Sequence, residues 1–371
     1  MIRIGVVGTG FIAQGFITAL KPRKEFVLSR VLTRRDIDTL PFTNSMWDLI
    51  DHSDLVVECS GDVIHAANVV NAALEANLPV VTMNSEFHVT CGTYFATKGF
   101  LTEAEGDQPG CLAALKENVI QMGFQPVVYG NIKRFLNHNP TYDEMLFWSK
   151  RYGISLQQAI SFTDGTKVQI EQALVANGLG ATILKDGLLG LSSEDVYKGA
   201  RVLAVSAERI GSPISDYVLS LNAPRGVFVV ARHDEAHQPA LEYLGLGEGP
   251  YYVLLQEFHL CYLEILKTIK RVISGGSVLL NNSLSPKISV AAIAKKNLSP
   301  GYKILTGIGS FDVRGVAVEL AETPQHVPIG LLSNAVVVKP IEQGEMIKCD
   351  QVNIPESLAL KAWKEVNNNA E

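Results

Sequence analysis

Residues 2–20 constrain the fold more than any other stretch of this chain. "IRIGVVGTGFIAQGFITAL" runs from an apolar, β-branched segment through Gly8 and Gly10 into an apolar helical pattern, with Ala13 as a third small residue. The first glycine permits a tight turn, the second lets a phosphate approach the backbone, and the small third residue lets the helix pack against the strand. The N–H groups at the start of the helix then favour a pyrophosphate. The residues predicted to contact a dinucleotide here are Gly8, Gly10, Phe11 and Ile12.

Strand and helix patterns alternate with short connections up to about residue 132. The strand-like runs "EFVLSRVLTRR", "LVVECSG" and "LPVVTMN" are separated by helical patterns, and the helix "GCLAALKENVIQMG" and the strand "QPVVYGNI" continue the alternation. Such alternation implies right-handed crossovers and a parallel sheet. We therefore predict an α/β chain in three parts: a doubly wound Rossmann domain over residues 1–132, an α+β catalytic and dimerisation domain over 133–284, and a small C-terminal β-rich domain over 285–371.

Composition excludes several classes of partner. The 371 residues carry a formal net charge of −6 without a basic block, so the surface would repel a phosphate backbone and we expect no nucleic-acid partner. No apolar run approaches the ~20 residues that span a bilayer, and no signal pattern opens the chain. We therefore expect a cytoplasmic protein without membrane contact. The five cysteines are scattered and form no CxxC pair, which indicates reduced thiols.

The end of the second predicted strand bears on the choice between NAD and NADP. An enzyme that binds the 2′-hydroxyl of NAD usually has an acid at this place, whereas this chain reads "VLTRRD", with Arg34 and Arg35. Two arginines can hold a 2′-phosphate with charge-assisted hydrogen bonds, so we predict NADP(H) as the cofactor. The alternative is a solvated basic turn, in which Asp36 could still reach a ribose hydroxyl.

Later strand ends add candidate residues to the same edge of the sheet. Ser60 and Gly61 follow the third predicted strand and Asn84 follows the fourth, and ligands of open α/β sheets bind at the carboxyl ends of the strands. We predict that all three contact the cofactor, although Asn84 could equally be an ordinary turn asparagine. The loop "EGDQPG" precedes the next helix. Its Asp107 could hold a substrate hydroxyl or a metal, or could simply cap that helix.

The segment "SFTDGTKVQIEQALVANGLG", residues 161–180, places Asp164, Lys167 and Glu171 at steps of three and four. On one helix these side chains fall within about 60° of one another. A surface pair of this kind contributes only ~0.3–0.5 kcal/mol. The same face, however, runs on into Leu174 and Val175, which a solvated face would not do. We therefore predict that Lys167 donates to the reacting oxygen of a substrate while Asp164 or Glu171 keeps the lysine charged.

Two further groups are candidates for substrate binding. "GNIKRFLNHNP" carries Lys133, Arg134 and Asn137 just past a predicted strand, where cations suit a phosphate or a developing oxyanion, although plain surface charges would need no such explanation. His259 in "FHLCYLE" could bind a polar group of the substrate or could be a core histidine. No histidines have metal-ligand spacing such as HExxH, but a loosely held Mg²⁺ or Mn²⁺ on carboxylates stays open.

Several longer segments are recognisable together. "VVTMNSEFHVTCG", "EGDQPGCL", "LNHNPTYDE", "FTDGTKVQIEQALVANGLG", "RGVFVVARHDE", "EGPYYVLLQEFHLCYLEILKTIKR" and "VAAIAKKNLSPGYKILTGIG" occur in this order. They resemble the homoserine-dehydrogenase-like oxidoreductases with a C-terminal SAF domain, a group that includes the type II 1-deoxy-D-xylulose 5-phosphate reductoisomerases. The chain departs from the better-known members of that group in two ways: it is shorter between the second and third strands, where "RRDIDTLPFTNSMWDLIDHSD" is compact, and it carries arginines after the second strand. In addition, Ser85 stands where homoserine dehydrogenases proper have a lysine. Simple homoserine oxidation is therefore the less favoured activity.

The resemblance implies an enzyme. We expect an NADPH-dependent reductase or reductoisomerase that acts on a small phosphorylated, sugar-like carbonyl compound. The alternatives are a homoserine-dehydrogenase-type alcohol or aldehyde dehydrogenase, without skeletal rearrangement, in a carbohydrate or nucleotide-sugar pathway, and a non-catalytic NADP-binding sensor or scaffold. The C-terminal SAF-like domain would close over a neighbouring site or stabilise a dimer, and we expect a homodimer or higher homo-oligomer.

Overall fold

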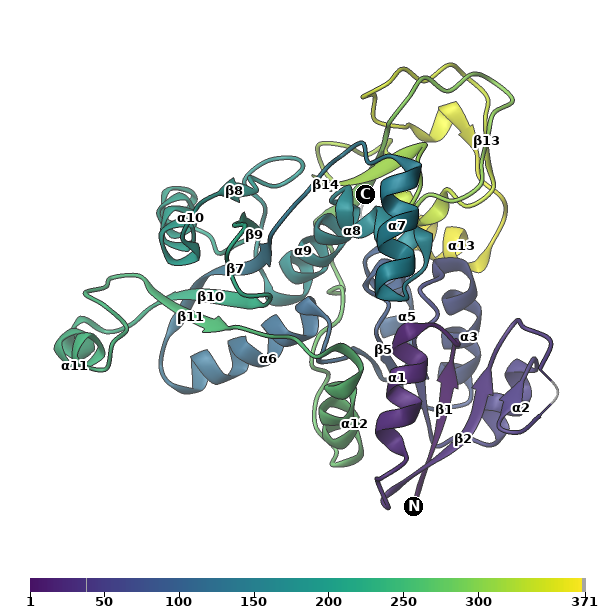
Figure 1. The fold of residues 1–371 in the computed structure, drawn as a ribbon, viewed down its shortest axis with the longest axis horizontal. Helices are drawn as coiled ribbons and strands as arrows, with labels where there is room; N and C mark the ends of the chain where they lie inside the picture. The colour runs from purple at the N-terminus through teal and green to yellow at the C-terminus, as the bar shows by residue number, and fades with distance from the viewer. Residues whose placement is uncertain (38, 369–371) are drawn as a thin grey trace.

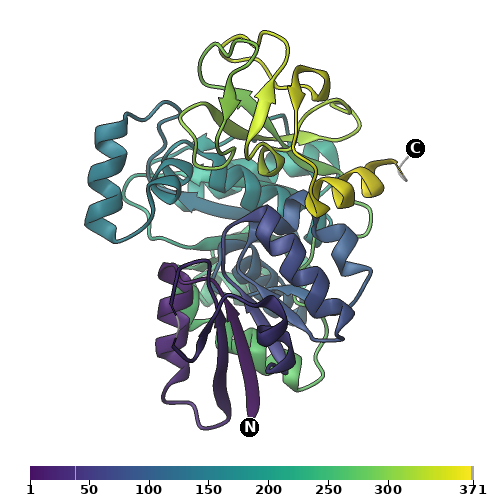
Figure 2. The same ribbon diagram turned by 90° about the vertical axis from the view of Figure 1, so that its right-hand side faces the viewer.

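The computed structural model describes residues 1–37 and 39–368. Three regions are visible in Figures 1 and 2. The N-terminal sheet lies at one end of the molecule, a second sheet with its helices lies beside it, and a small β-rich region from the C-terminal part of the chain covers the second region. The predicted fold class is confirmed.

The first sheet has six parallel strands in the order β3-β2-β1-β4-β5-β6. Its strands are β1 (Ile2–Val7), β2 (Phe26–Leu32), β3 (Phe42–Thr43), β4 (Leu55–Glu58), β5 (Val80–Thr82) and β6 (Leu101–Glu103). The order reverses between β1 and β4, and a doubly wound sheet binds its ligand beyond the carboxyl ends of the strands at such a reversal. The glycine turn that follows β1 therefore lies where a dinucleotide is expected.

Helices cover both faces of this sheet, and two of them come from late in the chain. On one face, α1 (Phe11–Leu20) packs beside α12 (Ile265–Ile273). On the other face, α2 (Met46–Asp51) and α3 (Val63–Glu75) pack with α13 (Leu358–Asn368). The sequence pattern had placed α12 in the second region and α13 in the third. The structure shows that their apolar faces complete the core of the first, because Ile265, Ile269 and Leu360 are buried there.

The second sheet has five strands in the order β11-β10-β7-β9-β8, with β10 antiparallel to both of its neighbours. The strands are β7 (Gln125–Lys133), β8 (Leu191–Ser192), β9 (Ile214–Leu219), β10 (Val227–Arg232) and β11 (Tyr252–Gln256). We had expected β7 to extend the first sheet. It does not, because the short strand β6 takes that edge and α6 (Gln108–Gln121) buries Leu112 and Val119 in the core of the second region.

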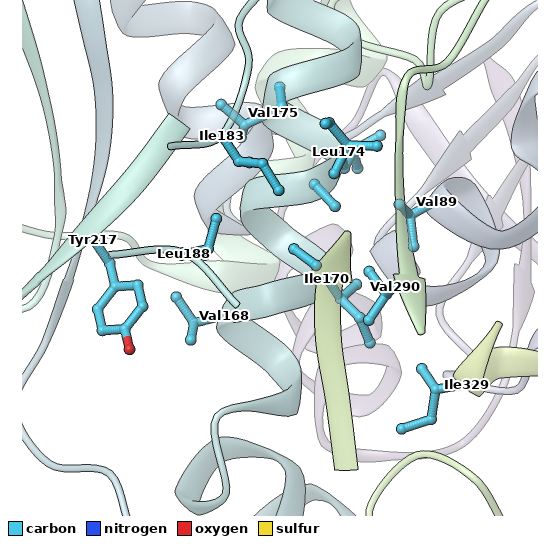
Figure 3. Packing of buried hydrophobic residues seen from close by; sticks show 14 of the residues in the cluster. Val89, Val168, Ile170, Leu174, Val175, Ile183, Leu188, Tyr217, Val290 and Ile329 are labelled. Atoms are coloured by element: carbon cyan, nitrogen blue, oxygen red, sulfur yellow. The ribbon is translucent and has the colours of Figure 1, made fainter. Parts of the chain in front are cut away.

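Further helices surround this second sheet. They are α7 (Tyr142–Tyr152), α8 (Leu156–Thr163), α9 (Thr166–Leu179), α10 (Val196–Ile210) and α11 (Gln238–Tyr243). Helix α9 is the central one, since all of its residues except Asn177 and Gly178 are buried. Figure 3 shows Ile170 and Leu174 of α9 among apolar side chains from both neighbouring regions, with Val89 from the first and Val290 and Ile329 from the C-terminal one. A helix that is buried on every side holds its polar side chains in fixed positions.

The C-terminal β-rich region consists of two small sheets. Strands β12 (Ile288–Ala294) and β14 (Val313–Glu319) form an antiparallel pair, and β13 (Lys303–Ile304), β15 (Ala335–Val337) and β16 (Val352–Asn353) form the other sheet. Over the described ranges, none of the helices is long and apolar enough to cross a membrane. All five cysteines are free thiols.

Candidate active site

The glycine turn has the geometry that a pyrophosphate needs. Gly8 has φ of +107°, and an added Cβ would lie 3.0 Å from the backbone oxygen of Cys59, so this position requires glycine. Gly10 is the N-cap of α1, and a Cβ built on it would meet no atom within 4 Å. The space in front of the helix N-terminus is therefore open, and the N–H groups of the first turn are able to bind an anion. Phe11 is 46% exposed beside this space, and Ile12 is partly buried.

The arginine pair lies at the carboxyl end of β2. Arg34 is 70% exposed, and its Nη1 is 2.9 Å from Oδ2 of Asp62, the N-cap residue of α3. Arg35 and Asp36 are exposed next to it. The guanidinium of Arg34 therefore reaches across the carboxyl ends of β2 and β4, which is the part of a doubly wound sheet that faces the adenosine ribose.

A buried carboxylate organises the end of β4. Oε1 of Glu58 accepts a hydrogen bond from the backbone N–H of Ser60 at 2.7 Å, and Oε2 accepts one from the hydroxyl of Thr82 at 3.0 Å. Burial raises the pKa of Glu58 above its ordinary value. These contacts fix the position of Ser60 and of the following Gly61. Gly61 has φ of +66°, and a Cβ added to it would meet no atom within 4 Å.

Asn84 follows β5 and has one unused donor. The side chain is buried, and its Oδ1 accepts from the backbone N–H of Phe87 at 3.0 Å, at the start of α4 (Ser85–Phe87). Among the described residues, its Nδ2 makes no hydrogen bond of normal geometry, although it lies near enough to the Glu58 carboxylate to lower the pKa of that group. A buried amide donor without a partner is costly, and a cofactor carbonyl or hydroxyl would satisfy it. The open glycine turn and this free donor both fit a nicotinamide dinucleotide.

Lys167 lies at the centre of a charged cluster next to this edge. Its Nζ is 2.7 Å from the Oγ of Ser85, 3.0 Å from Oδ2 of Asp107 and 3.1 Å from Oε1 of Glu86. The three ionic side chains are only 10–12% exposed. Burial alone would lower the pKa of Lys167, but Asp107, Glu86 and Glu171 outweigh burial and raise that pKa well above its ordinary value. The lysine is therefore a protonated donor.

The ammonium also controls its main carboxylate partner. Burial by itself raises the pKa of Asp107, and the neighbouring Lys167 charge more than offsets it, so the pKa of Asp107 lies below its ordinary value. The alternative of a plain capping aspartate does not describe this residue, because Asp107 stands at the N-cap of α6 without a side-chain capping bond. Its carboxylate faces Lys167 and Ser85 instead.

Glu171 anchors a second cluster, one turn further along α9. Its Oε2 accepts from Nδ2 of Asn131 at 2.7 Å and from Nζ of Lys133 at 3.1 Å. With its amide nitrogen turned towards the acids, Gln108 donates to Oε1 of Glu171 at 3.0 Å and to Oδ1 of Asp107 at 2.7 Å. Burial raises the pKa of Glu171. The two clusters thus form one network, which contains the candidates Lys133, Glu171 and Asp107.

Asp164 has a different partner from the one we expected. It is the C-cap of α8, and Gly165, with φ of +89°, separates it from α9, so Asp164 and Lys167 do not share a helix face. Oδ2 of Asp164 lies 2.6 Å from Nζ of Lys295, and Oδ1 accepts from the backbone N–H of Thr166 at 2.9 Å. Of the two acids expected to keep Lys167 charged, Asp164 is therefore the wrong one, whereas the charge of Glu171 does help to raise the pKa of Lys167. The acids that contact Lys167 are Asp107 and Glu86.

The remaining predicted substrate residues lie around the network. His259 Nδ1 is 3.3 Å from the carbonyl oxygen of Gly106, next to Asp107. Arg134 is exposed, and its Nε donates to the carbonyl of Leu221 at 2.9 Å. Asn137 accepts from the backbone N–H of Asn139 at 3.1 Å. The structure brings His259 to the edge of the network, and it gives Arg134 and Asn137 no contact with it. The substrate-binding roles of these three residues stay predictions.

No metal site accompanies these acids in the part of the chain that the structure describes, since no three His, Cys, Asp or Glu side chains gather as a metal ion would need. The charges of Asp107 and Glu171 are instead met by lysines. The suggested Mg²⁺ or Mn²⁺ thus has no support from the geometry.

Several residues of the site were not predicted from the sequence. They are Glu58, Ser85, Glu86, Gln108 and Asn131. Most of them stand at or just beyond the carboxyl end of a strand or at the start of a helix, so the rule that placed Ser60 and Asn84 would have found them. Asn131 lies within β7, and nothing in its local sequence distinguishes it.

The open glycine turn, the free amide donor and the buried lysine define an NAD(P)-dependent oxidoreductase. Comparisons with protein families agree. Residues 8–92 match the NAD binding domain of homoserine dehydrogenase, and residues 106–265 match the catalytic domain of oxidoreductase DRL. The chain thus joins a segment similar to a homoserine dehydrogenase NAD binding domain to a segment similar to the catalytic domain of oxidoreductase DRL. The match to a catalytic domain favours an enzyme over a non-catalytic sensor.

Solved structures resemble this chain only in outline. S. aureus homoserine dehydrogenase is 12% identical with a TM-score of 0.38, and the match covers 86% of this chain and 93% of that chain. UDP-N-acetylglucosamine 3-dehydrogenase from Acidithiobacillus ferrooxidans is 12% identical with a TM-score of 0.44, over 76% of this chain and 92% of that chain. No curated protein matches the chain.

Proposed function

We propose that the protein reduces the carbonyl group of a small phosphorylated, sugar-like compound with NADPH, as a reductase or a reductoisomerase, and that Lys167 donates the proton to the carbonyl oxygen. One observation carries the proposal. Lys167 is a protonated, nearly buried ammonium held by Asp107 and Glu86 beside the carboxyl ends of the dinucleotide-binding sheet. Positive charge preorganised in a site of low water content stabilises an oxyanion far better than the same charge in water.

The residues of the network have distinct tasks in this proposal. The bound cofactor supplies the hydride. Lys167 donates a hydrogen bond to the carbonyl oxygen, and its raised pKa is no obstacle to proton transfer, because the alkoxide that forms is a much stronger base than an amine. Asp107 and Glu86 keep the ammonium in place and charged. Ser85, 2.7 Å from Nζ, offers a hydroxyl through which the lysine can regain a proton.

The preference for NADP(H) rests on Arg34 and Arg35. A 2′-phosphate next to β2 would meet the exposed guanidinium of Arg34, which pairs with the carboxylate of Asp62. Arg35 is exposed at the same turn. Charge-assisted bonds to phosphate are about twice as strong as neutral ones, so the two side chains give NADPH an advantage over NADH.

A phosphorylated substrate suits the cations around the network. Lys133 is 16% exposed and already paired with Glu171, so the charge that we propose for a phosphate is that of Arg134, which is exposed and makes no contact with the network. The second candidate is an alcohol or aldehyde dehydrogenase of the homoserine dehydrogenase type. It is favoured by the same lysine, since hydride transfer to a carbonyl needs one such donor and no group that promotes carbon migration. We further propose a homo-oligomer, with the C-terminal SAF-like domain as a stabilising element.

Loss of NADPH absorbance with 1-deoxy-D-xylulose 5-phosphate, other ketose phosphates and nucleotide sugars tests the proposal. NMR of the product separates reduction from skeletal rearrangement. Lys167→Met should bind NADPH normally and lose turnover by at least ~10²-fold, the usual contribution of a positioned acid. If turnover survives in Lys167→Met, the assignment of the proton donor is wrong. Sedimentation of the purified chain tests the homo-oligomer.

A further inference from the structure

A buried ion pair joins the C-terminal β-rich region to the start of the central helix. Nζ of Lys295 lies 2.6 Å from Oδ2 of Asp164 and 2.7 Å from the carbonyl oxygen of Ser310. The Lys295 side chain is 4% exposed, and that of Asp164 is fully buried. Breaking such a pair on one side leaves a lone buried charge, which is far more costly than losing a surface pair. The pair therefore strongly constrains the segment of chain that carries Asp164.

What it holds is the beginning of α9. Asp164 uses its other oxygen, Oδ1, to accept from the backbone N–H of Thr166 at 2.9 Å, which satisfies one of the free donors of the first turn. Gly165 at the N-cap has no side chain with which to do this. Lys167 is the next residue. The carboxylate that Lys295 fixes therefore holds the backbone N–H of Thr166, the residue directly before the proposed proton donor.

The C-terminal β-rich region also forms two backbone hydrogen bonds to side chains of α9. The Oγ1 of Thr166 accepts from the backbone N–H of Gly315 at 2.9 Å, and Oε1 of Gln169 accepts from that of Ala317 at 2.8 Å. Both donors belong to β14. Thr166 and Gln169 are therefore hydrogen-bonded to the C-terminal region, whereas Lys167 is hydrogen-bonded to Ser85 and Asp107, which follow strands of the first sheet. Helix α9 thus lies between the C-terminal region and the first region.

We propose that Lys295 is a positioning residue for Lys167. By neutralising Asp164 it fixes the first turn of α9 and thereby the place of the Lys167 ammonium between Asp107 and Ser85. The inference rests on the proposed function only for the task of Lys167, not for its position. Without Lys295, the buried Asp164 carboxylate would be left with the charge of Arg314, which lies beyond ion-pair distance. The carboxylate would then compete with Asp107 for the Lys167 ammonium, or turn towards water and loosen the first turn of α9.

Competitive labelling of lysines tests this without a substrate. The full-length protein is treated at pH 8 with trace acetic anhydride, and the acetylation of Lys167 is measured by peptide mass spectrometry relative to Lys133. Lys133 is the internal reference because it belongs to the same network but stands on β7. In Lys295→Met we expect the ratio of Lys167 to Lys133 labelling to rise about fivefold, which corresponds to about 1 kcal/mol of lost positioning.

Three variants complete the design. Lys296→Met removes the neighbouring, half-exposed lysine that pairs with Asp312 at 2.6 Å, and it should leave the ratio unchanged. The double variant D164N/K295M buries no lone charge and keeps an oxygen for Thr166, so the ratio should fall back towards that of the unaltered protein. If Lys295→Met does not fold, Lys295→Gln, which keeps a donor but no charge, should raise the ratio in the same direction by a smaller factor.

The outcomes separate this inference from the proposed function. An unchanged ratio in both Lys295 variants, or equal acceleration of Lys167 and Lys133, would overturn the positioning role. Full NADPH turnover in Lys167→Met would overturn the proposed proton donor and leave the labelling result standing. A raised ratio that the double variant does not reverse would show that the charge of Asp164 is not the cause, and it would also overturn the inference.

Discussion

Removing Lys167 should destabilise the protein in a way that depends on pH. Lys167→Met leaves the carboxylates of Asp107 and Glu86, which are 11% and 12% exposed, without their counter-charge. Removing one partner of a buried ion pair typically costs about 3–5 kcal/mol. We therefore expect the free energy of unfolding to fall by about that amount at pH 8, where both carboxyl groups ionise in the unfolded chain.

The loss should shrink as the pH falls. In the unaltered protein the pKa of Asp107 is depressed, so its contribution to stability is present above the ordinary carboxyl pKa and is lost only in acid. In the variant, burial without the lysine raises the folded-state pKa above the unfolded value. Each unit of that rise costs about 1.4 kcal/mol at high pH, and the cost disappears as the pH falls through the raised pKa and the carboxyl groups take up protons.

The measurement is urea unfolding of Lys167→Met and the unaltered protein, without cofactor, at pH 8 and pH 5. The matched control is Lys339→Met, which breaks the 2.6 Å pair with Asp350 where both side chains are more than half exposed, and it should leave both midpoints in place. A destabilisation of Lys167→Met that is the same at both pH values would refute the argument, because it would mean that lost packing and not the uncompensated carboxylates is responsible.

Three other predictions follow from the cofactor turn and the lysine. The double variant R34A/R35A should weaken NADPH binding by about 10–100-fold, since a hydrogen bond to a charged group contributes about 1.5–3 kcal/mol. NADH binding should be unchanged, and titration of nucleotide fluorescence measures both affinities. Equal losses for the two cofactors would contradict the 2′-phosphate assignment. Gly10→Ala should fold normally, because the backbone of residue 10 has φ of −78° and an added Cβ meets no atom, but it should bind the dinucleotide weakly. Gly8→Ala should lower the melting temperature, because of its φ of +107° and the contact with Cys59. A larger loss of binding in Gly8→Ala and a larger loss of stability in Gly10→Ala would show that Gly10 does not face the phosphates. The pKa of Lys167 is raised above the ordinary lysine value, so the donor stays protonated until the pH passes that raised pKa. The rate of carbonyl reduction should therefore show no fall attributable to Lys167 below about pH 10. A fall in rate near pH 8 that disappears in Lys167→Arg would contradict the assignment.

Local patterns in the sequence predicted the parts of the site that depend on local structure. The turn at Gly8 and Gly10, the residues after β4 and β5, and the importance of Lys167 could all be inferred from spacing and from the rule that ligands bind at strand ends. The partner of Lys167 could not be inferred. Helical spacing suggested Asp164, but Gly165 interrupts the helix between them, and a glycine before a helical run is a sign of a turn that should have lowered the weight of that spacing.

Contacts between distant parts of the chain account for the rest. Lys295 is more than a hundred residues from Asp164, and Lys133 and Glu171 meet only because α9 packs against β7. No local pattern distinguishes a lysine that will be buried against an acid from one that will be solvated, because the distinction depends on which surfaces the folded chain brings together. Neither α12 nor α13 was predicted as a helix, and nothing in their local sequence indicates the sheet on which they pack.

The packing of α12 and α13 on the first sheet has a consequence for biosynthesis. Domains usually fold in order as the chain leaves the ribosome, yet the dinucleotide-binding sheet here has core residues, such as Ile269 and Leu360, that are synthesised long after its last strand. Until those helices emerge, apolar patches on both faces of the sheet face water or a chaperone. The nascent chain therefore cannot complete the core of its first region before α13 has been made, and we expect cofactor binding to follow the synthesis of that helix.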